Sequence, residues 1–170
     1  MTGVRVRTAE LPRDLPTVQR LCWDYRDYLV SFSDEMRVLT EAFYPADAYA
    51  DLMAALPVKH ARPRGAILLV EKDGAAVGCG MTQPLGNGDA EIKRVYISPA
   101  ARGTGAGQLL SQALVDQARA DGYTRVLLDT NKEFAPARAL YEKLGFRNRG
   151  PYSQVPPGTE DHLAFYELTL

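Results

Sequence analysis

Three closely spaced glycines constrain this chain more than any other feature. Gly103, Gly105 and Gly107 lie between a strand-like run, residues 92–97, and a run with helical periodicity, residues 109–120. Glycine lets a ligand approach the backbone closely, and the first amides of a helix have no internal acceptors and carry the positive end of its dipole. Such a turn is typical of a pyrophosphate site. A strand-to-helix turn without a ligand fits the glycines, taken alone, equally well.

The spacing around these glycines excludes two familiar phosphate loops. A Walker A loop needs Lys and then Ser or Thr after its last glycine, where this chain has Gln108 and Leu109. A dinucleotide fingerprint needs two residues between its second and third glycines and an acidic residue roughly 20 positions later, and here one residue separates Gly105 from Gly107. Asp129 lies near that distance, but one short helix and then extended sequence follow its strand. The repeated strand-helix units of a doubly wound sheet are therefore missing.

Three sequence blocks together resemble the GCN5-related N-acetyltransferases, a family that binds acetyl-CoA. They are residues 91–99, 102–107 and 140–146, and their order and spacing agree with the family. The family signature is Arg or Gln, two residues, Gly, one residue, and Gly or Ala, which Arg102, Gly105 and Gly107 satisfy. The blocks cover about the C-terminal half of the chain, and the first 65 or so residues contribute nothing to the match.

The resemblance implies an α/β (α+β) fold, with a mixed, mostly antiparallel central sheet and helices on both faces. Periodicity agrees with it. We predict strands at 4–7, 66–71, 75–85, 90–97, 124–130 and 163–170, and helices at 14–29, 47–56, 106–121 and 136–144. Residues 31–44 are predicted as irregular, and Pro57 as the end of a helix. In the 90–97 strand, alternation places Ile92 and Tyr96 on one face and Val95 and Ile97 on the other.

The resemblance also implies how the cofactor lies. The 90–97 strand splays from the next one, and the pantetheine arm pairs with the exposed backbone like an added strand. We therefore expect pantetheine at Val95 and Ile97, with Asn131 as a further contact. Many relatives place an Asn seven residues before the helix tyrosine, where this chain has Phe134. The expected pyrophosphate contacts are Arg102 and the amides of Gly103, Thr104, Gly105, Ala106, Gly107 and Gln108.

Acetyl transfer to an amine needs a deprotonated amine, a polarised carbonyl and a stabilised or protonated thiolate. Tyr141 matches the family tyrosine that approaches the cofactor sulfur, so we predict it as the general acid, with core packing as the alternative. The resemblance also implies that the N–H of Val95 polarises the carbonyl. We predict Glu91 as the proton acceptor, directly or through water, because in a regular strand it shares a face with Val95. A bulge would change that phase, and a salt bridge with Lys93 or Arg94 is the alternative role.

Composition favours one globular domain, residues 1–170, and excludes other classes of protein. The chain is 46% hydrophobic and 24% charged, with a net charge of -1, which argues against a nucleic-acid partner. No segment has the length and apolar character of a membrane span, and residues 1–8 lack the apolar core of a signal peptide, so we predict a cytoplasmic enzyme. Two cysteines and two histidines support neither a disulfide framework nor a metal site.

The acceptor is less constrained. Several residues of the first 50 fit an aromatic, partly acidic pocket for a cationic amine, or core and surface: Trp23, Tyr25, Tyr28, Tyr44, Tyr49, Asp34, Glu35 and Glu41. Residues 151–158 fit a mobile lid or a contact in a homodimer. We predict an acetyl-CoA-dependent N-acetyltransferase that acts on a primary amine of a small molecule or a peptide amino terminus. Two alternatives remain open: an acyl-CoA-binding regulatory module with little catalysis, and a transferase that uses a longer acyl-CoA.

Overall fold

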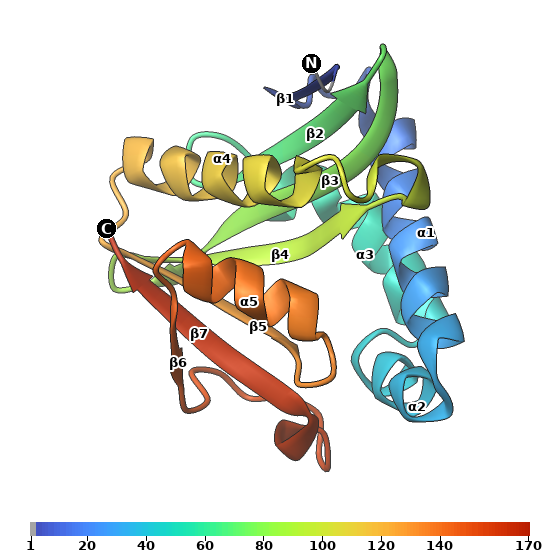
Figure 1. Ribbon diagram of the computed structural model, residues 1–170, viewed down its shortest axis with the longest axis vertical. Helices are drawn as coiled ribbons and strands as arrows, with labels where there is room; N and C mark the ends of the chain where they lie inside the picture. Colours follow the sequence, from blue (N-terminus) through green and yellow to red (C-terminus); the bar gives the residue numbers. More distant parts are fainter. Residues whose placement is uncertain (1–2) are drawn as a thin grey trace.

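The computed structural model describes residues 3–170, which form one seven-stranded sheet with helices on both faces (Figure 1). The strand order is β1-β2-β3-β4-β5-β7-β6, and every neighbouring pair is antiparallel except β4 and β5. The strands are β1 (Val4–Thr8), β2 (Ala66–Lys72), β3 (Ala75–Gly86), β4 (Asp89–Ile97), β5 (Arg125–Asn131), β6 (Arg147–Arg149) and β7 (Leu163–Thr169). The predicted mixed, mostly antiparallel sheet is confirmed.

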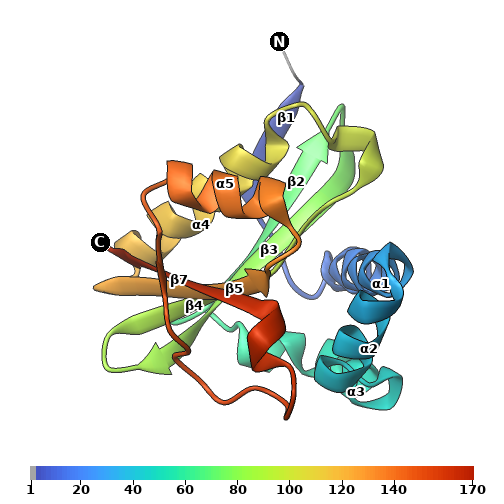
Figure 2. The same ribbon diagram turned by 60° about the horizontal axis from the view of Figure 1, so that its bottom comes forward.

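Five α-helices cover the two faces of the sheet. They are α1 (Leu15–Phe32), α2 (Asp34–Phe43), α3 (Ala46–Lys59), α4 (Ala106–Ala120) and α5 (Ala135–Lys143). Figure 2 shows α4 and α5 on one face and the first three helices on the other. Leu110 and Leu114 of α4 belong to a core cluster with Leu68, whereas Val18 of α1 belongs to a second cluster with Leu69. Adjacent residues of β2 thus face opposite cores, as strand alternation requires.

Residues 31–44, predicted as irregular, contain helix α2, so that prediction is wrong. Ser33 caps the helix: its Oγ accepts a hydrogen bond from the N–H of Met36 at 3.0 Å. The negative charge of Asp34, in the first turn, interacts favourably with the positive end of the helix dipole. The predicted end of α3 at Pro57 is also wrong, because the helix continues to Lys59. Pro57 lies in the last turn of α3, so only a short stretch of helix follows the residue that lacks an N–H donor.

A bulge in β4 changes the faces that its side chains take. Lys93 lies opposite Met81 and Tyr96 opposite Cys79, so two residues of β4 oppose the single residue between those partners. Arg94 sits at this bulge with φ of +51°. As a result Ile92 packs on the α4 face, together with Val95 and Ile97, and Tyr96 packs on the α1 face. The predicted pairing of Ile92 with Tyr96 is wrong because the extra residue shifts the alternation.

Strands β4 and β5 pair at one end and diverge at the other. Their parallel register covers three pairs only, from Asp89 opposite Arg125 to Glu91 opposite Leu127. The guanidinium of Arg125 holds the paired end, with Nη2 2.7 Å from Asp89 and Nη1 2.9 Å from Glu167 of β7. Figure 1 shows the two strands separating beyond this point. The backbone of β4 after Glu91 therefore faces a gap rather than a neighbouring strand, as the resemblance implied.

Candidate active site

A cleft of about 450 Å³ occupies the gap between β4 and β5. Its walls come from α1, β4, β5 and α5, and it is lined on the β4 side by Val95 and Ile97. Arg102, Gly107 and Tyr141 line it as well. The structure therefore brings together five residues that the sequence placed in one site, although they are spread over 47 positions of the chain.

The segment after Arg102 ends the cleft in an open turn. Gly103 and Gly105 have φ values of +78° and +82°, and a Cβ on either would meet nothing within 4 Å. Helix α4 begins its hydrogen-bond ladder with the N–H of Leu109, which donates to the carbonyl of Gly105 at 3.0 Å. The amides of Ala106, Gly107 and Gln108 therefore precede the first helical bond. Open space above these amides is what an anion needs in order to reach them.

Arg102 lies between this turn and helix α1. Its guanidinium carbon is 4.7 Å from the centroid of the Tyr28 ring, a cation–π contact, and its Nε donates to the carbonyl of Ile97 at 3.3 Å. The side chain is exposed. Within the described chain, the guanidinium of Arg102 thus contacts a neutral ring and a neutral carbonyl. Its positive charge is therefore available to a phosphate.

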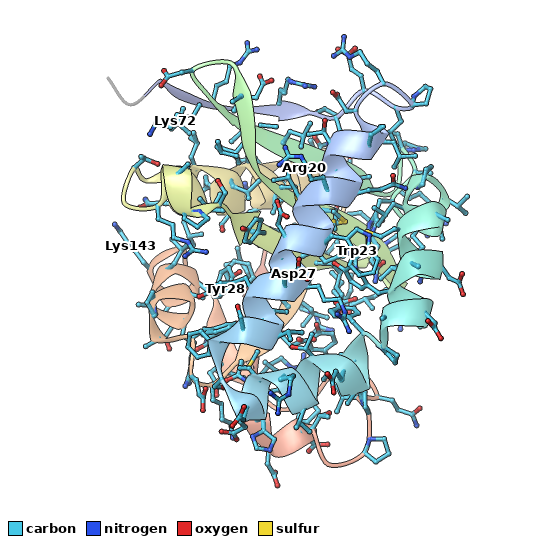
Figure 3. The ribbon with its side chains drawn as sticks, turned by 90° about the vertical axis from the view of Figure 1, so that its right-hand side faces the viewer. Arg20, Trp23, Asp27, Tyr28, Lys72 and Lys143 are labelled. Atoms are coloured by element: carbon cyan, nitrogen blue, oxygen red, sulfur yellow. The ribbon has the colours of Figure 1, made fainter. Side chains whose placement is uncertain are left out.

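Two lysines flank the same turn. Lys72 donates to the carbonyl of Ala100 at 3.1 Å, and Lys143 donates to Oε1 of Gln108 at 3.3 Å. Figure 3 shows both at one edge of the molecule, on either side of the start of α4. Within residues 3–170, neither lysine has a carboxylate partner within 4.0 Å, nor has Arg102. Three cations without counter-ions surround the glycine turn and favour a polyanionic ligand there.

Tyr141 projects from α5 into the cleft and is 7% exposed. Burial raises the pKa of its hydroxyl to about 12, and the charge of Asp129 acts in the same direction. The hydroxyl therefore keeps its proton at neutral pH and is able to donate it. The Tyr141 ring also packs edge-to-face against Phe146, with the ring centroids 5.7 Å apart. Its position is therefore compatible with both the packing role and the predicted acid role.

A smaller cavity, about 70 Å³, lies beside the cleft under α2. The two cavities share Tyr25, Asp129, Thr130 and Phe134. Apolar side chains of α1, α2 and β7 line part of the small cavity: Leu29, Met36, Leu39, Phe43 and Leu163. Asn131, predicted as a pantetheine contact, lines this cavity rather than the large cleft. Its Oδ1 accepts a hydrogen bond from the N–H of Glu133 at 2.7 Å and so holds the turn into α5.

The aromatic residues of the first 50 positions divide between pocket and core. Tyr25 and Tyr44 line the small cavity. Trp23 and Tyr28 project from opposite sides of α1 (Figure 3): Tyr28 lines the large cleft, whereas Trp23 packs against Tyr49 at 4.9 Å.

The acidic residues of the same segment do not contribute to the pocket. Among the described residues that line the two cavities, Asp34, Glu35 and Glu41 are absent. Glu35 lies 2.7 Å from His162, and Asp34 lies 3.1 Å from Arg37. Asp129 of β5 and Glu133, just before α5, are the carboxylates among the described residues that line the cavities.

Glu91 lies on the face opposite Val95, so the prediction that the two share a face is wrong. The bulge at Arg94 is the cause. Glu91 is 5% exposed. Its carboxylate accepts hydrogen bonds from Gln83 Nε2 at 2.8 Å and from the Tyr152 hydroxyl at 2.6 Å. Lys93 Nζ lies 3.9 Å from it. Both oxygens of Glu91 are therefore already in contact with donors.

Sequence reasoning missed Asp129, Lys93 and Tyr152 as members of the site. Asp129 lines both cavities, and Lys93 lines the smaller one. Tyr152, from the loop predicted as a lid or dimer contact, reaches Asp129 with its hydroxyl at 3.4 Å. Burial raises the pKa of the Asp129 carboxyl, Lys93 opposes this and Glu91 adds to it. The available signal was a lone carboxylate after three apolar residues in a central strand, at 126–129.

Comparison with known proteins agrees with this geometry. Residues 21–146 match the acetyltransferase (GNAT) family. The chain belongs to that family. It is 32% identical over 158 residues to an uncharacterized N-acetyltransferase of Schizosaccharomyces pombe, covering 91% of this chain and 90% of the relative.

Two further likenesses agree with the family and the fold. The chain is 33% identical over 135 residues to an IAA acetyltransferase of Azospirillum brasilense, covering 78% of this chain and 85% of the relative. The Salmonella typhimurium protein yncA, solved with its cofactor acetyl-CoA, superimposes with a TM-score of 0.72 at 21% identity, covering 99% and 94% of the two chains. Within the described residues, no helix is long and apolar enough to cross a membrane, and no cluster of His, Cys, Asp and Glu has the makings of a metal site.

Proposed function

We propose that this acetyltransferase moves the acetyl group of acetyl-CoA to a primary amine of a small molecule or a peptide amino terminus. The observation that carries the proposal is the unpaired backbone of β4 along the 450 Å³ cleft, which leads to the open glycine turn. A pantetheine arm fits against the backbone of Val95 and Ile97. A pyrophosphate fits at the amides of residues 103–108, close to Arg102. The likeness to yncA, solved with acetyl-CoA, supports the same placement.

The residues beside this cleft match the proton transfers that the reaction needs. Tyr141, protonated at neutral pH, is placed to give a proton to the leaving sulfur. The N–H of Val95, at the divergent end of β4, is a donor for the acetyl oxygen. Asp129 lines the cleft, and Glu91 lies near it because both carboxylates contact the Tyr152 hydroxyl. One of these two carboxylates takes the ammonium proton.

Two measurements test the proposal. Coenzyme A is expected to raise the melting temperature as its concentration passes the dissociation constant. Thiol release from acetyl-CoA is expected with at least one member of a panel of small amines and peptides.

The outcomes separate the alternatives. No thermal shift at millimolar coenzyme A contradicts the cofactor site itself. A shift without thiol release from any amine favours an acyl-CoA-binding regulatory module. Faster release from a longer acyl-CoA favours a different donor.

A further inference from the structure

The small cavity under α2 contains an acid that the cofactor chemistry does not use. Asp129 stands on β5 two residues past Leu127, the last residue paired with β4. It lines both the cleft and the small cavity, so its carboxylate faces the passage between them. Leu128 belongs to the α4 core cluster, so the neighbouring Asp129 points toward α2. Tyr141 therefore approaches the passage from one side of the sheet and Asp129 from the other.

The hydrogen bonds of the two candidate carboxylates differ. The proton of the Tyr152 hydroxyl goes to Glu91 at 2.6 Å, because the distance to Asp129 is 3.4 Å and a hydroxyl has a single proton to donate. Glu91 also receives a bond from Gln83. Asp129 thus has one long contact, whereas Glu91 has two short ones, and the less occupied carboxylate is the better proton acceptor.

Charged and titratable side chains from several neighbouring elements surround Asp129. On β4, Lys93 lies 3.9 Å from Glu91, and its charge lowers the pKa of Asp129 more than the charge of Glu91 raises it. Arg94 is bound to His60 and Met81. Burial raises the pKa of the three nearby tyrosine hydroxyls, which stay neutral at physiological pH: Tyr25, Tyr141 and Tyr152. Tyr44, at the end of α2, lines the cavity too. Asp129 has no cation within 4.0 Å among the described residues.

The size and walls of the cavity limit the rest of the acceptor. A water molecule needs about 10–15 Å³, so 70 Å³ has room for about five to seven groups of that size. Helices α1 and α2 contribute four apolar side chains to the cavity, beside the polar groups of Thr40, Tyr44 and Lys93: Leu29, Met36, Leu39 and Phe43. This favours a short, branched or cyclic hydrocarbon body.

We propose that the acceptor is a compact apolar monoamine whose ammonium group binds Asp129, and that Asp129 takes its proton. This inference rests on the proposed acetyl transfer. The ammonium gives one proton to the Asp129 carboxylate, which later releases it to water. The amine nitrogen then bonds to the acetyl carbon as the carbon–sulfur bond breaks. The sulfur receives the proton of Tyr141, and the second amine proton passes through water to the Tyr141 oxygen and restores its hydroxyl.

Binding without any acyl donor tests the inference first. The probe is 3-methylbutylamine, with leucine, which adds a carboxylate to the same body, and 3-methylbutanol, which lacks the ammonium, as matched controls. Calorimetric titration is expected to show the amine binding at least tenfold more tightly than either. Asp129→Asn is expected to weaken amine binding about tenfold or more, equivalent to roughly 1.4 kcal/mol, and Glu91→Gln less than threefold.

The pH dependence gives a second readout. Amine binding to the parent protein is expected to fall as Asp129 becomes protonated, and binding to Asp129→Asn to stay flat over the same range. In thiol release, Asp129→Asn is expected to recover as pH approaches the pKa of the amine, since free amine needs no base. Equal binding by Asp129→Asn and the parent, tighter binding of leucine, or no binding of the amine overturns the inference. Stabilisation by coenzyme A separates such a failure from failure of the proposed function.

Discussion

The two sides of the gap between β4 and β5 use different chemical groups, mainly backbone on one side and side chains on the other. On the α4 side, the expected cofactor contacts are mainly backbone, namely the unpaired edge of β4 and the amides that precede Leu109, with Arg102 and Tyr141 as side chains. On the α2 side, the site consists of side chains from distant segments, among them Asp129 and Tyr152, which are 23 positions apart. A backbone site depends on few residue types, so we expect it to bind the shared cofactor. A side-chain site changes with each substitution, so we expect it to select the acceptor.

The largest expected effect is on proton donation from the α5 side. Tyr141→Phe keeps the buried ring and removes the hydroxyl, so turnover is expected to fall roughly 10²- to 10⁴-fold with coenzyme A affinity almost unchanged. Steady-state kinetics and calorimetric titration measure the two quantities. Equal losses in turnover and affinity would identify Tyr141 as a packing residue and would remove the acid from this side of the comparison.

A second change breaks the backbone site itself. Gly105 has φ of +82° and faces open space, so Gly105→Val strains the turn and fills the volume above the amides. Loss of two charge-assisted hydrogen bonds would weaken coenzyme A binding by roughly 100-fold or more.

Gly122→Val is the matched control. Gly122 has φ of +89°, is equally open, and lies at the far end of α4. Its variant is expected to lose similar stability in a thermal melt and to keep its coenzyme A affinity. Equal loss of affinity in both variants would show that the turn acts only through stability.

A smaller effect is expected on the side-chain side. Tyr152→Phe removes the hydroxyl whose long contact with Asp129, at 3.4 Å, helps to lower the pKa of that carboxyl, so that pKa rises. The pH at which the amine-dependent rate reaches half its maximum is expected to move upward, and the rate at neutral pH to fall about tenfold. Coenzyme A affinity is the control and is expected to stay the same. A profile that keeps its midpoint would place the titrating base elsewhere.

The smallest effect is on stability. Burial raises the pKa of Asp129 in the folded chain, so the fold favours the protonated form and ionisation destabilises it. The cost is absent below the unfolded pKa, near 3.9, and grows as pH rises through the folded value. Asp129→Asn cannot ionise. Its melting temperature relative to the parent's is expected to rise by about 2–4 °C between pH 4 and pH 8. A constant difference would mean that Asp129 is not held in a costly ionised state.

The same contrast explains what the sequence predicted. The glycine turn and the helix after it follow from local chemistry, because Gly103 and Gly105 take positive φ and α4 begins at once. The position of Tyr141 came from the family resemblance. Helix α2 was not predicted, because Ser33, its N-cap, was not taken as the start of a helix.

The acceptor side depends on features that no local pattern encodes. One bulge at Arg94 reverses the face of Glu91 relative to Val95. The contact between Tyr152 and Glu91 joins residues 61 positions apart, and it exists only once β7 has placed the 151–158 loop beside β4. Residues in such contacts cannot be grouped from spacing, so Asp129 stood out in the sequence only as a carboxylate in an apolar strand.

Amide hydrogen exchange with and without coenzyme A tests the central claim most directly, because it reports backbone and location together. The account predicts slower exchange on binding in peptides covering 95–97 and 103–108, with no change in peptides covering α2, residues 34–43, or the 151–158 loop. Protection confined to α2 and that loop, with residues 103–108 unchanged, would contradict the division of the gap into a backbone site for the cofactor and a side-chain site for the amine.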